Sequence, residues 1–446
     1  MTKGNPGARE QALHVLNQVL EQGAYSNVAL QRALRGVAAQ DAALIKQLVY
    51  GTLTYRRSLD YLLEQWLSRP LEKLRPAVRN LLRMGLYQIL YLRIPDHAAV
   101  AESVRIAHQV GHRGVAGLVN AVLRRAIREQ EQLPWPQTGD VSFDLSIRYS
   151  FPEWMVQRWI QRLGEEEAAR LCAAQNTAPR LEVRLNSLRT DPEQLVAELE
   201  AAGVGVCSHP LVENSLQLEN AVLPQLAALQ AGRCVVQSAA STLVGQVVDP
   251  APQQVVYDVC AAPGGKTLHL AELMRCQGRV LALDLHAHRL RLLERTAQRL
   301  GINCVELHQA DATRLVASEW PAAARVLVDA PCSGLGVIRR KPDIRWNRSL
   351  PDIQALADIQ LAILRQVADL VEPEGILVYS VCSTEPEETE QVVQAFLVED
   401  RRFAPAGWPA PLQAVFGKEI QEGCLTTYPH RHDLDGFFIC RLQRVK

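Results

Sequence analysis

Two cysteines stand where β-strands are predicted to end. Cys332 follows the apolar run ARVLVDAP, and Cys382 follows GILVYSV. The carboxyl ends of parallel strands meet at one edge of a sheet, so we expect both thiols to face the same crevice. For either cysteine alone a buried structural role is favoured, because cysteine prefers the protein interior. Two thiols at equivalent strand ends favour nucleophilic chemistry instead.

Acidic side chains end three of the predicted strands. Asp284 closes RVLALD, Asp311 follows CVELHQA, and Asp329 closes ARVLVD. Carboxylates gathered in one crevice repel one another, so the expected ligand carries hydrogen-bond donors or positive charge. Asp284 is placed to accept hydrogen bonds from ribose hydroxyls, and Asp311 from an adenine amino group. The alternatives are a nicotinamide dinucleotide, which gives the thiols no role, and a helix cap made by Asp284.

A glycine-rich turn follows the first predicted strand of this region. The segment VVYDVCAAPGGKT, residues 255–267, predicts a buried strand, a tight turn and the start of a helix. Glycine lets the backbone approach a ligand, and a helix N-terminus offers N–H groups to an anion. A phosphate loop requires glycine at Cys260, which argues against a nucleotide triphosphatase. What remains is the carboxylate of a methionine-like cofactor, a dinucleotide pyrophosphate, or an ordinary strand-to-helix turn.

One reaction needs a thiolate beside a methyl donor, namely methylation of carbon 5 of a pyrimidine. Carbon 5 of cytosine is a poor nucleophile, but addition of a thiolate to carbon 6 turns the ring into an enamine that can attack an electrophilic methyl group. A base then removes the carbon-5 proton, and the thiol is eliminated. Protonation of ring N3 assists the addition, and Asp329 is placed for that step if it can hold a proton.

Alternating strands and helices after residue 231 predict the domain that positions these residues. Five apolar strand candidates with helical segments between them favour a mostly parallel sheet covered on both faces. The closing LTTYP and GFFICRLQ predict an antiparallel hairpin, which gives a seven-stranded sheet. By analogy, this layout is that of S-adenosylmethionine-dependent methyltransferases. We assign residues 231–446 to this α/β domain.

Two further domains are predicted before it. Residues 1–132 show the apolar stripes of an all-helical domain, with one helix starting at Pro76 and a last helix from about Val115 to Arg128. The prolines of LPWPQTGD, residues 133–140, indicate a linker. Residues 145–230 mix helices with short strands and predict a small α/β module.

Charge is unevenly distributed along the 446 residues. Lys+Arg and Asp+Glu balance at 48 each, yet residues 1–130 contain 18 basic and 9 acidic side chains. A basic helical domain suggests a polyanionic partner, and a solvated surface is an equally supported alternative. In the loop GVIRRKPDIRW, residues 336–346, Arg339, Arg340 and Lys341 suit contact with nucleic-acid phosphates, with Trp346 stacking on a base, and a solvated basic loop is the alternative.

The cysteine pattern and the lack of long apolar runs limit the class of protein. Ten cysteines occur without a C-x-x-C pair or zinc-ligand spacing, so no metal site is expected. The opening MTKGNPGARE lacks an apolar signal core, and no run approaches the ~18 apolar residues of a membrane span. We therefore expect a cytoplasmic protein without a membrane partner, whose thiols are all free.

The motifs CAAPGGKT, DAPCSG and VCST, in this order and with the acids between them, resemble the NOL1/NOP2/Sun family of RNA cytosine-5 methyltransferases. The loop GVIRRKPDIRW and the closing YP…DGFF add to the likeness. The segment from AREQALHVL to GLVNAVLRR is similar to the NusB-type RNA-binding helical domain. The resemblance covers nearly the whole chain and implies a Rossmann-like catalytic domain that uses S-adenosylmethionine. It further implies a monomer acting on small-subunit (16S) ribosomal RNA, at cytosine 967.

The resemblance also assigns roles to residues. It implies that Asp284 holds the cofactor ribose, that Asp311 holds the adenine, and that Asp329 lies between cofactor and target base. Cys382 would be the nucleophile, and Cys332 would release the methylated product, whereas DNA cytosine methyltransferases use a Pro-Cys thiol as nucleophile. The residues implied to wrap the methionine end of the cofactor are Cys260, Ala261, Ala262, Pro263, Gly264, Gly265 and Lys266.

Two positions depart from the family pattern. Val381 stands where the family often has threonine, which removes a hydroxyl that could orient the thiol of Cys382. Ser238 follows Gln237 where the family often has aspartate. Two other functions remain open: an RNA-binding assembly factor with a vestigial methyltransferase half, and methylation of a protein or small molecule. The intact acids and thiols argue against the first, and the basic domain against the second.

Overall fold

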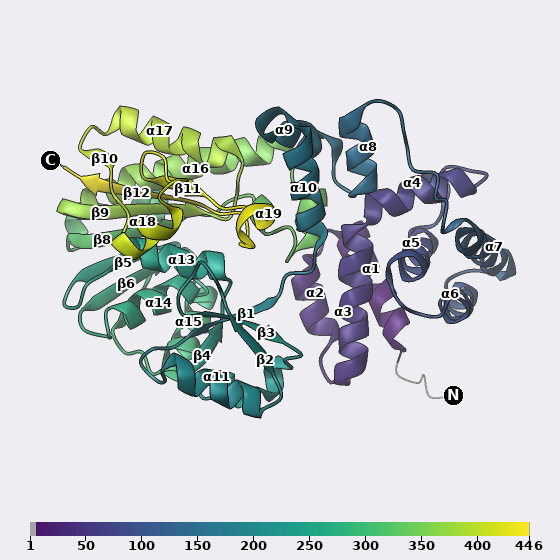
Figure 1. Ribbon diagram of the computed structural model, residues 1–446, viewed down its shortest axis with the longest axis horizontal. Helices are drawn as coiled ribbons and strands as arrows, with labels where there is room; N and C mark the ends of the chain where they lie inside the picture. The colour runs from purple at the N-terminus through teal and green to yellow at the C-terminus, as the bar shows by residue number, and fades with distance from the viewer. Residues whose placement is uncertain (1–5, 446) are drawn as a thin grey trace. The chain divides into compact units, whose positions relative to one another are not determined.

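The computed structural model describes residues 6–445 (Figure 1). Residues 1–5, at the start of the predicted first domain, and Lys446 at the end of the last lie outside the described residues. The contacts between residues divide the chain into two compact units. Unit 1 contains the chain up to Ala178 together with Ile338–Asn347, and unit 2 contains Pro179–Val337 and the chain from Arg348.

Unit 1 is helical, as predicted for its N-terminal part. Helix α5 has Pro76 in its first turn, where the missing N–H costs nothing. Helix α8 follows Asp140, whose carboxylate accepts hydrogen bonds from two backbone N–H groups of the first turn. Its helices, within the described residues, are α1 (Ala8–Gln22), α2 (Ser26–Ala33), α3 (Ala39–Thr54), α4 (Arg56–Trp66), α5 (Pro76–Tyr91), α6 (Asp96–Val110), α7 (Arg113–Glu129), α8 (Val141–Arg148), α9 (Glu153–Leu163) and α10 (Glu165–Asn176).

Unit 1 also includes a segment from far along the chain, Ile338–Asn347. Its Arg345 side chain is buried and donates from Nη1 to Ser150 O and Asn176 Oδ1, both at 3.0 Å. Asp343 Oδ1 accepts a hydrogen bond from Ser26 Oγ at 2.5 Å. These buried polar contacts hold the segment to the helices, because a buried charged or polar group must be paired. The division into two compact units leaves the predicted boundaries at 132, 145 and 230 as predictions.

The small α/β module is a four-stranded antiparallel sheet in unit 2, with strand order β2-β3-β1-β4. Helix α11 (Pro192–Ala201) crosses between the first two strands and begins after Asp191, whose side chain accepts from Gln194 N. The strands are β1 (Leu181–Leu185), β2 (Gly205–Ser208), β3 (Ser215–Glu219) and β4 (Cys234–Val236). The predicted module is confirmed, although its last strand lies beyond residue 230.

The large sheet of unit 2 has eight strands within the described residues, in the order β10-β12-β9-β8-β5-β6-β7, with β11 paired to β12. The five predicted apolar strands pair in parallel, and the closing strands are antiparallel, as expected. The prediction of seven strands is wrong by one, because the three-residue β10 contains Pro405 and has too few residues to show alternation. The strands are β5 (Val255–Val259), β6 (Arg279–Asp284), β7 (Val305–Gln309), β8 (Ala323–Asp329), β9 (Val371–Val381), β10 (Phe403–Pro405), β11 (Cys424–Thr426) and β12 (Phe438–Arg444).

Both faces of this sheet are covered by helices (Figure 1). Val256 belongs to the core shared with α13, α14 and α15, and the next residue, Tyr257, belongs to the core shared with α16 and α17. Successive strand residues point to opposite faces, so each strand serves both cores. The covering helices are α13 (Ala239–Val248), α14 (Gly265–Leu273), α15 (Ala287–Leu300), α16 (Leu350–Val367) and α17 (Glu390–Glu399). The carboxyl ends of the parallel strands are then the place where a ligand can reach the sheet.

Between residues 6 and 445, no helix combines the length and apolarity that a membrane crossing requires. Over the same range, no group of three or more His, Cys, Asp and Glu side chains is arranged to hold a metal ion.

Candidate active site

The two predicted thiols meet at the carboxyl ends of adjacent strands. Strands β8 and β9 pair in parallel, and the loops that follow them bring Cys332 Sγ to 3.3 Å from Cys382 Sγ. The hydrogen bond with Cys382, together with burial, raises the pKa of Cys332 well above its ordinary value. Either sulfur can be the donor in this contact, so the two thiols titrate as a pair.

A lysine and an aspartate form an ion pair beside the thiols. Lys266 Nζ lies 2.8 Å from Asp329 Oδ2, and Ser380 Oγ donates to the other oxygen of Asp329 at 2.8 Å. Burial lowers the pKa of Lys266, but attraction to Asp329 and Cys382 outweighs it, so the pKa lies above its ordinary value. Lys266 is therefore an ammonium ion. Since a negative Cys382 stabilises this cation, the cation in turn stabilises the thiolate of Cys382.

The glycine-rich turn is built as the sequence indicated, with the helix α14 starting at Gly265. Gly264 has φ +104°, and a Cβ at this position would collide with the side chain of Leu293, so glycine is required. Beneath the turn, buried Asp258 accepts a hydrogen bond from Thr267 Oγ1 at 2.6 Å. Its second oxygen, Oδ1, has no hydrogen-bond partner among the described residues. Burial raises the pKa of Asp258 to about 7.

The remaining predicted aspartates differ in their surroundings. Asp284 is buried, and its two oxygens accept from the backbone N–H groups of Ala262 at 3.1 Å and His286 at 2.9 Å. It therefore secures the turn, while each oxygen keeps a second lone pair for another donor. Asp311 is partly exposed, and hydrogen bonds from Thr313 lower its pKa.

Three carboxylates lie close to Cys260 in the glycine-rich turn. Burial raises the pKa of Cys260, and the nearby charges of Asp329, Asp258 and Asp284 raise it further. Three acids thus surround the turn, and one of them, Asp258, was not among the predicted site residues. A signal was available, because Asp258 is a charged residue inside the apolar strand VVYDV.

Sequence reasoning also missed Glu388, a fully buried acid behind the two thiols. Its Oε1 accepts from Ser333 N at 2.7 Å, and its Oε2 accepts from Ser333 Oγ and Ser383 Oγ, both at 2.5 Å. Each of these serines directly follows one of the two cysteines. One carboxylate therefore holds both thiol-bearing loops. The run TEPEETE resembles a solvated helix start, and the repeated Cys-Ser dipeptide was the available signal.

The two departures from the family pattern have structural roles. Val381 is fully buried in the core beneath α16 and α17, where a hydroxyl would need a partner. Ser238 caps α13, its Oγ accepting from Ser241 N at 3.3 Å. Gln237, just after β4, accepts through Oε1 from buried Arg184 Nε of β1 at 2.7 Å and so holds the start of α13 to the small module.

The predicted RNA loop has two parts with different environments. Arg339 and Arg340 are partly exposed, and Lys341 is exposed. Trp346 instead donates its indole N–H to Leu53 O at 2.6 Å, within unit 1. The structure thus gives this ring a packing role, while phosphate binding by the three cations stays a prediction.

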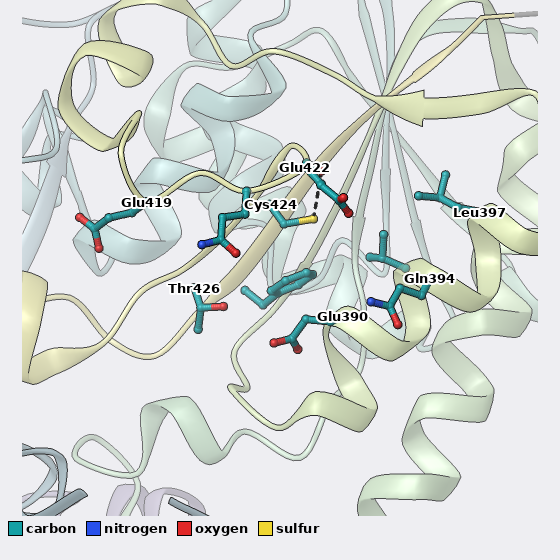
Figure 2. Close-up of a pocket in the computed structure, with 10 residues that line it drawn as sticks. Glu390, Gln394, Leu397, Glu419, Glu422, Cys424 and Thr426 are labelled. Carbon is teal, nitrogen blue, oxygen red and sulfur yellow. Dashed lines mark hydrogen bonds between the residues drawn. The ribbon is translucent and has the colours of Figure 1, made fainter. Parts of the chain in front are cut away.

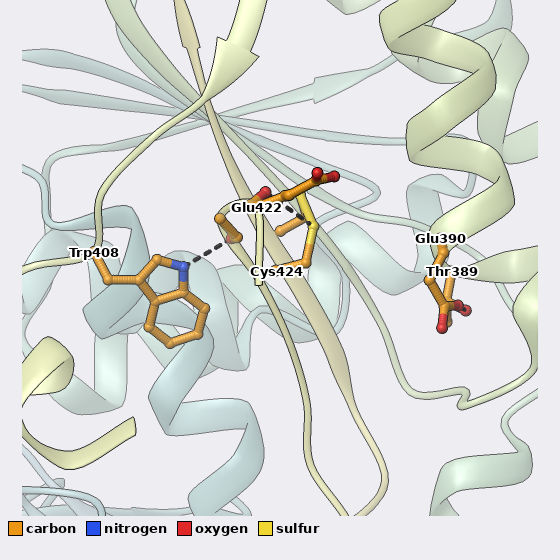
Figure 3. The surroundings of a disulfide bond; sticks show 7 residues. Thr389, Glu390, Trp408, Glu422 and Cys424 are labelled. Atoms are coloured by element: carbon orange, nitrogen blue, oxygen red, sulfur yellow. Dashed lines mark hydrogen bonds between the residues drawn. A yellow bond between two sulfur atoms is a disulfide. The ribbon is translucent and has the colours of Figure 1, made fainter. Parts of the chain in front are cut away.

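A cavity of about 400 Å³ lies elsewhere in unit 2 and contains none of the predicted site residues (Figure 2). Glu390 and Gln394 of α17 face Cys424 and Thr426 of β11 across it. Beside it, Cys424 is disulfide-bonded to Cys440 (Figure 3). The prediction that all thiols are free is therefore wrong for this pair. The reason is register, because the two residues lie directly opposite on β11 and β12, with their Cα atoms 4.0 Å apart.

Comparison with known proteins identifies three regions of the chain. Residues 6–128 match the NusB family, residues 151–223 match the ferredoxin-like domain of RsmF/B-like methyltransferases, and residues 245–443 match the family described as 16S rRNA methyltransferase RsmB/F. These regions follow the predicted order of helical domain, small module and catalytic domain.

Similar proteins extend over nearly the whole chain. It is 38% identical over 449 residues to "Probable ribosomal RNA small subunit methyltransferase B" of Bacillus subtilis (strain 168), covering 98% of both chains. It is 35% identical over 441 residues to "Ribosomal RNA small subunit methyltransferase B" of Pseudomonas putida, covering 97% of this chain and 98% of the relative. The crystal structure of PH0851 superposes with a TM-score of 0.81 at 26% identity, covering 97% of this chain and 98% of that one. The predicted resemblance is confirmed, and the chain belongs to the RsmB/F family of 16S ribosomal RNA methyltransferases.

Proposed function

We propose that this protein transfers a methyl group from S-adenosylmethionine to carbon 5 of a cytosine in 16S ribosomal RNA, through a bond between Cys382 and carbon 6. Family membership supports methylation of ribosomal RNA in general. The observation that carries the finer proposal is the 3.3 Å contact between the sulfur atoms of Cys332 and Cys382 beside the Lys266–Asp329 ion pair. Methylation of a nitrogen or a ribose hydroxyl would leave these two thiols without a function.

The residues around the turn fit S-adenosylmethionine. The buried oxygen of Asp258 that lacks a partner suits a cationic donor such as an amino-acid ammonium group. Asp284 retains lone pairs for ribose hydroxyls, and partly exposed Asp311 can accept from an adenine amino group. Cys260 to Lys266 would wrap the methionine end of the cofactor, whose sulfonium supplies an electrophilic methyl group when bound.

Cys382 is assigned as the nucleophile for two reasons. Its sulfur contacts that of Cys332, and it lies close enough to Lys266 to raise the pKa of that ammonium ion. The nearby ammonium ion favours a thiolate, which is the reactive form. Its sulfur forms a bond to carbon 6, and the electrons of the 5,6 double bond move through the ring toward N3.

The Lys266–Asp329 pair is assigned to N3. The negative charge that develops there requires a proton or a hydrogen bond. Attraction to Asp329 outweighs burial and keeps the pKa of Lys266 above its ordinary value, so we assign proton donation to Lys266 and orientation of its ammonium group to Asp329. After carbon 5 has taken the methyl group, a base takes the carbon-5 proton, the 5,6 double bond re-forms, and the electrons of the sulfur–carbon bond leave with the Cys382 thiolate. Cys332, whose sulfur touches Cys382, is assigned to this release step.

The proposal is tested by methyl transfer to 16S ribosomal RNA, followed by bisulfite mapping of RNA from cells that lack the protein. We expect one 5-methylcytosine, at cytosine 967 if the resemblance extends to the target, to disappear in those cells and to reappear after incubation with enzyme and S-adenosylmethionine. An unchanged 5-methylcytosine pattern, or transfer to another atom, would refute the cytosine-5 assignment. Calorimetric titration with S-adenosylmethionine distinguishes an active enzyme from a vestigial one, which would give no saturable heat.

A further inference from the structure

Unit 1 contains a pocket that has no role in the chemistry proposed above. It has a volume of about 380 Å³ and is lined chiefly by Tyr55, Tyr91, Trp135, Arg148, Tyr149 and Asn176. We call this the aromatic pocket. Its residues come from the α3–α4 junction, the end of α5, the segment before α8, and the ends of α8 and α10.

One wall of the aromatic pocket is a stack of tyrosines. The rings of Tyr55 and Tyr91 have centroids 3.8 Å apart and an interplanar angle of 17°. Tyr87 lies behind them, with its centroid 5.7 Å from that of Tyr91. Stacked rings fix one another's orientation, so this wall is rigid before any ligand arrives. A rigid, flat aromatic surface suits another flat aromatic group.

The other sides of the pocket are also held in place. Trp135 packs against the apolar core of unit 1, and its backbone N–H donates to Leu133 O at 2.8 Å. Asn176 Nδ2 donates to Tyr149 O at 2.7 Å, and its Oδ1 accepts from Arg345. The segment of residues 133–140, predicted as a linker, therefore contributes an ordered side chain to the pocket.

Arg148 adds a positive charge to the rim of the pocket. Its side chain is exposed at the end of α8, and within the described residues it has no carboxylate partner. Other exposed arginines of unit 1, such as Arg75 and Arg113, also lack a carboxylate partner within the described residues, so Arg148 is distinguished by its place in the lining of the pocket. An unpaired guanidinium beside aromatic rings can contact a phosphate while the rings receive the adjoining base.

We infer that the aromatic pocket binds an unpaired base of ribosomal RNA, with Arg148 on the neighbouring phosphate. Base stacking on aromatic side chains tolerates any base, because every base has a flat π-face. The excess of 18 basic over 9 acidic side chains in residues 1–130 attracts the strand to this unit. The inference rests on the proposed function only in taking RNA as the substrate. A proline or aromatic side chain of a protein partner would use the rings but not the arginine.

The test measures binding of the full chain to a single-stranded RNA oligonucleotide by fluorescence anisotropy. Trp135→Ala and Arg148→Gln are each expected to weaken binding about 5- to 100-fold, the range typical for loss of a base stack or a phosphate contact. Trp135→Phe keeps a flat ring and should bind within about twofold of the parent protein. The matched control is Arg113→Gln, which removes an exposed arginine of α7 outside the pocket and should have little effect.

An abasic version of the oligonucleotide distinguishes contacts to the base from contacts to the phosphate. Replacing the recognised base should weaken binding to the parent protein but not to Trp135→Ala. Equal affinity of the parent protein, Trp135→Ala and Arg148→Gln for RNA would overturn the inference and assign the pocket to a protein side chain. If Trp135→Ala fails to fold, exposed Arg148→Gln compared with Arg113→Gln decides the result.

The assay omits S-adenosylmethionine, so it does not depend on the methylation chemistry. Weakened binding in the pocket variants supports the inference even if the methyl group is found on an atom other than carbon 5. Conversely, normal cytosine methylation with unchanged RNA affinity in both variants would refute base binding by the aromatic pocket and leave the proposed function intact.

Discussion

Two pairs of cysteines belong to the same large sheet, and their environments are opposite. Cys332 and Cys382 follow adjacent parallel strands, and their sulfur atoms lie 3.3 Å apart without a disulfide bond. Cys424 and Cys440 lie directly opposite on antiparallel strands and form a disulfide (Figure 3). The first pair lies beside the Lys266 ammonium ion, whereas the cavity beside the second is lined by three glutamates, Glu390, Glu419 and Glu422 (Figure 2).

Two close pairs of sulfur atoms in one sheet thus have different surroundings. A cation and a hydrogen-bond donor favour a thiolate, and carboxylates oppose it. The antiparallel ladder alone brings Cys424 and Cys440 together, so that pair needs no further support. Cys332 and Cys382 lie on loops, and the carboxylate of Glu388 holds both loops. The position of this pair thus depends on contacts beyond the sheet itself.

Removing the proposed nucleophile should give the largest loss of methyl transfer. It directly tests the contrast between the two cysteine pairs. Cys382→Ala should reduce methyl transfer by at least about a thousandfold, the scale of loss when an enzyme loses its nucleophile. Binding of S-adenosylmethionine, measured by calorimetry, should be unchanged. Cys440→Ala removes a cysteine of the disulfide pair and is the matched control, which should retain activity. Full activity in Cys382→Ala would exclude this thiol from the reaction.

Removing the other thiol of the catalytic pair should trap the reaction part-way. Cys332→Ala leaves the nucleophile in place but removes the group assigned to release, so a covalent protein–RNA adduct should accumulate. The adduct is detected as a shifted band in denaturing gels, and it should be absent from a Cys332→Ala, Cys382→Ala double variant. Normal turnover without an adduct would show that Cys332 has no part in release.

Weakening the hydrogen bonds that hold the two cysteine-bearing loops should lower kcat by an intermediate amount. Glu388→Gln keeps the size of the side chain but replaces an acceptor oxygen with an NH₂ group, which cannot accept from the serine hydroxyls. We expect kcat to fall about 10- to 100-fold, because misplacement of reacting groups by about 1 Å has this cost. Affinity for S-adenosylmethionine should stay the same.

The control for this variant is Glu390→Gln, two residues along the chain, where the side chain is exposed and lines the cavity of Figure 2. It should leave kcat unchanged. An unchanged kcat in Glu388→Gln as well would mean that the two loops keep their positions without this carboxylate.

Breaking the disulfide should have the smallest effect on activity. The bridge spans 16 residues, so Cys440→Ser should lower the free energy of unfolding by up to about 3 kcal/mol through loop entropy. Methyl transfer below the unfolding transition should change by less than about twofold. Chemical denaturation of the variant and of the reduced parent protein measures the first effect, and initial rates measure the second. Loss of activity in a fully folded Cys440→Ser variant would contradict a purely structural role.

The edge of the sheet where the thiols and acids lie could be predicted from the sequence, because several local signals agree there. Apolar strands that end in Asp284, Asp329 and Cys382 place polar groups at the carboxyl ends of a parallel sheet, and the glycine turn marks where a ligand approaches. These signals depend on strand period and turn chemistry, which neighbouring residues in the chain determine. The roles proposed for these residues still await the experiments above.

Other features depend on contacts that no local pattern reports. Ile338–Asn347 packs with the helices of unit 1 although it lies between strands of the catalytic domain in sequence, because Arg345 finds its acceptors there. The aromatic pocket likewise collects Tyr55 and Trp135 from segments that are distant in sequence.

The sequence by itself determined the order of the domains, the parallel sheet with its antiparallel end, and the edge where the thiols and acids lie. These follow from apolar periodicity and from residue types at strand ends, which act over a few neighbouring positions. Only the tertiary structure decided that Lys266 pairs with Asp329, that Glu388 holds both thiol loops, and that Cys424 bonds to Cys440. Each of those contacts joins side chains from separate elements, so its partner is chosen by how the strands and helices pack.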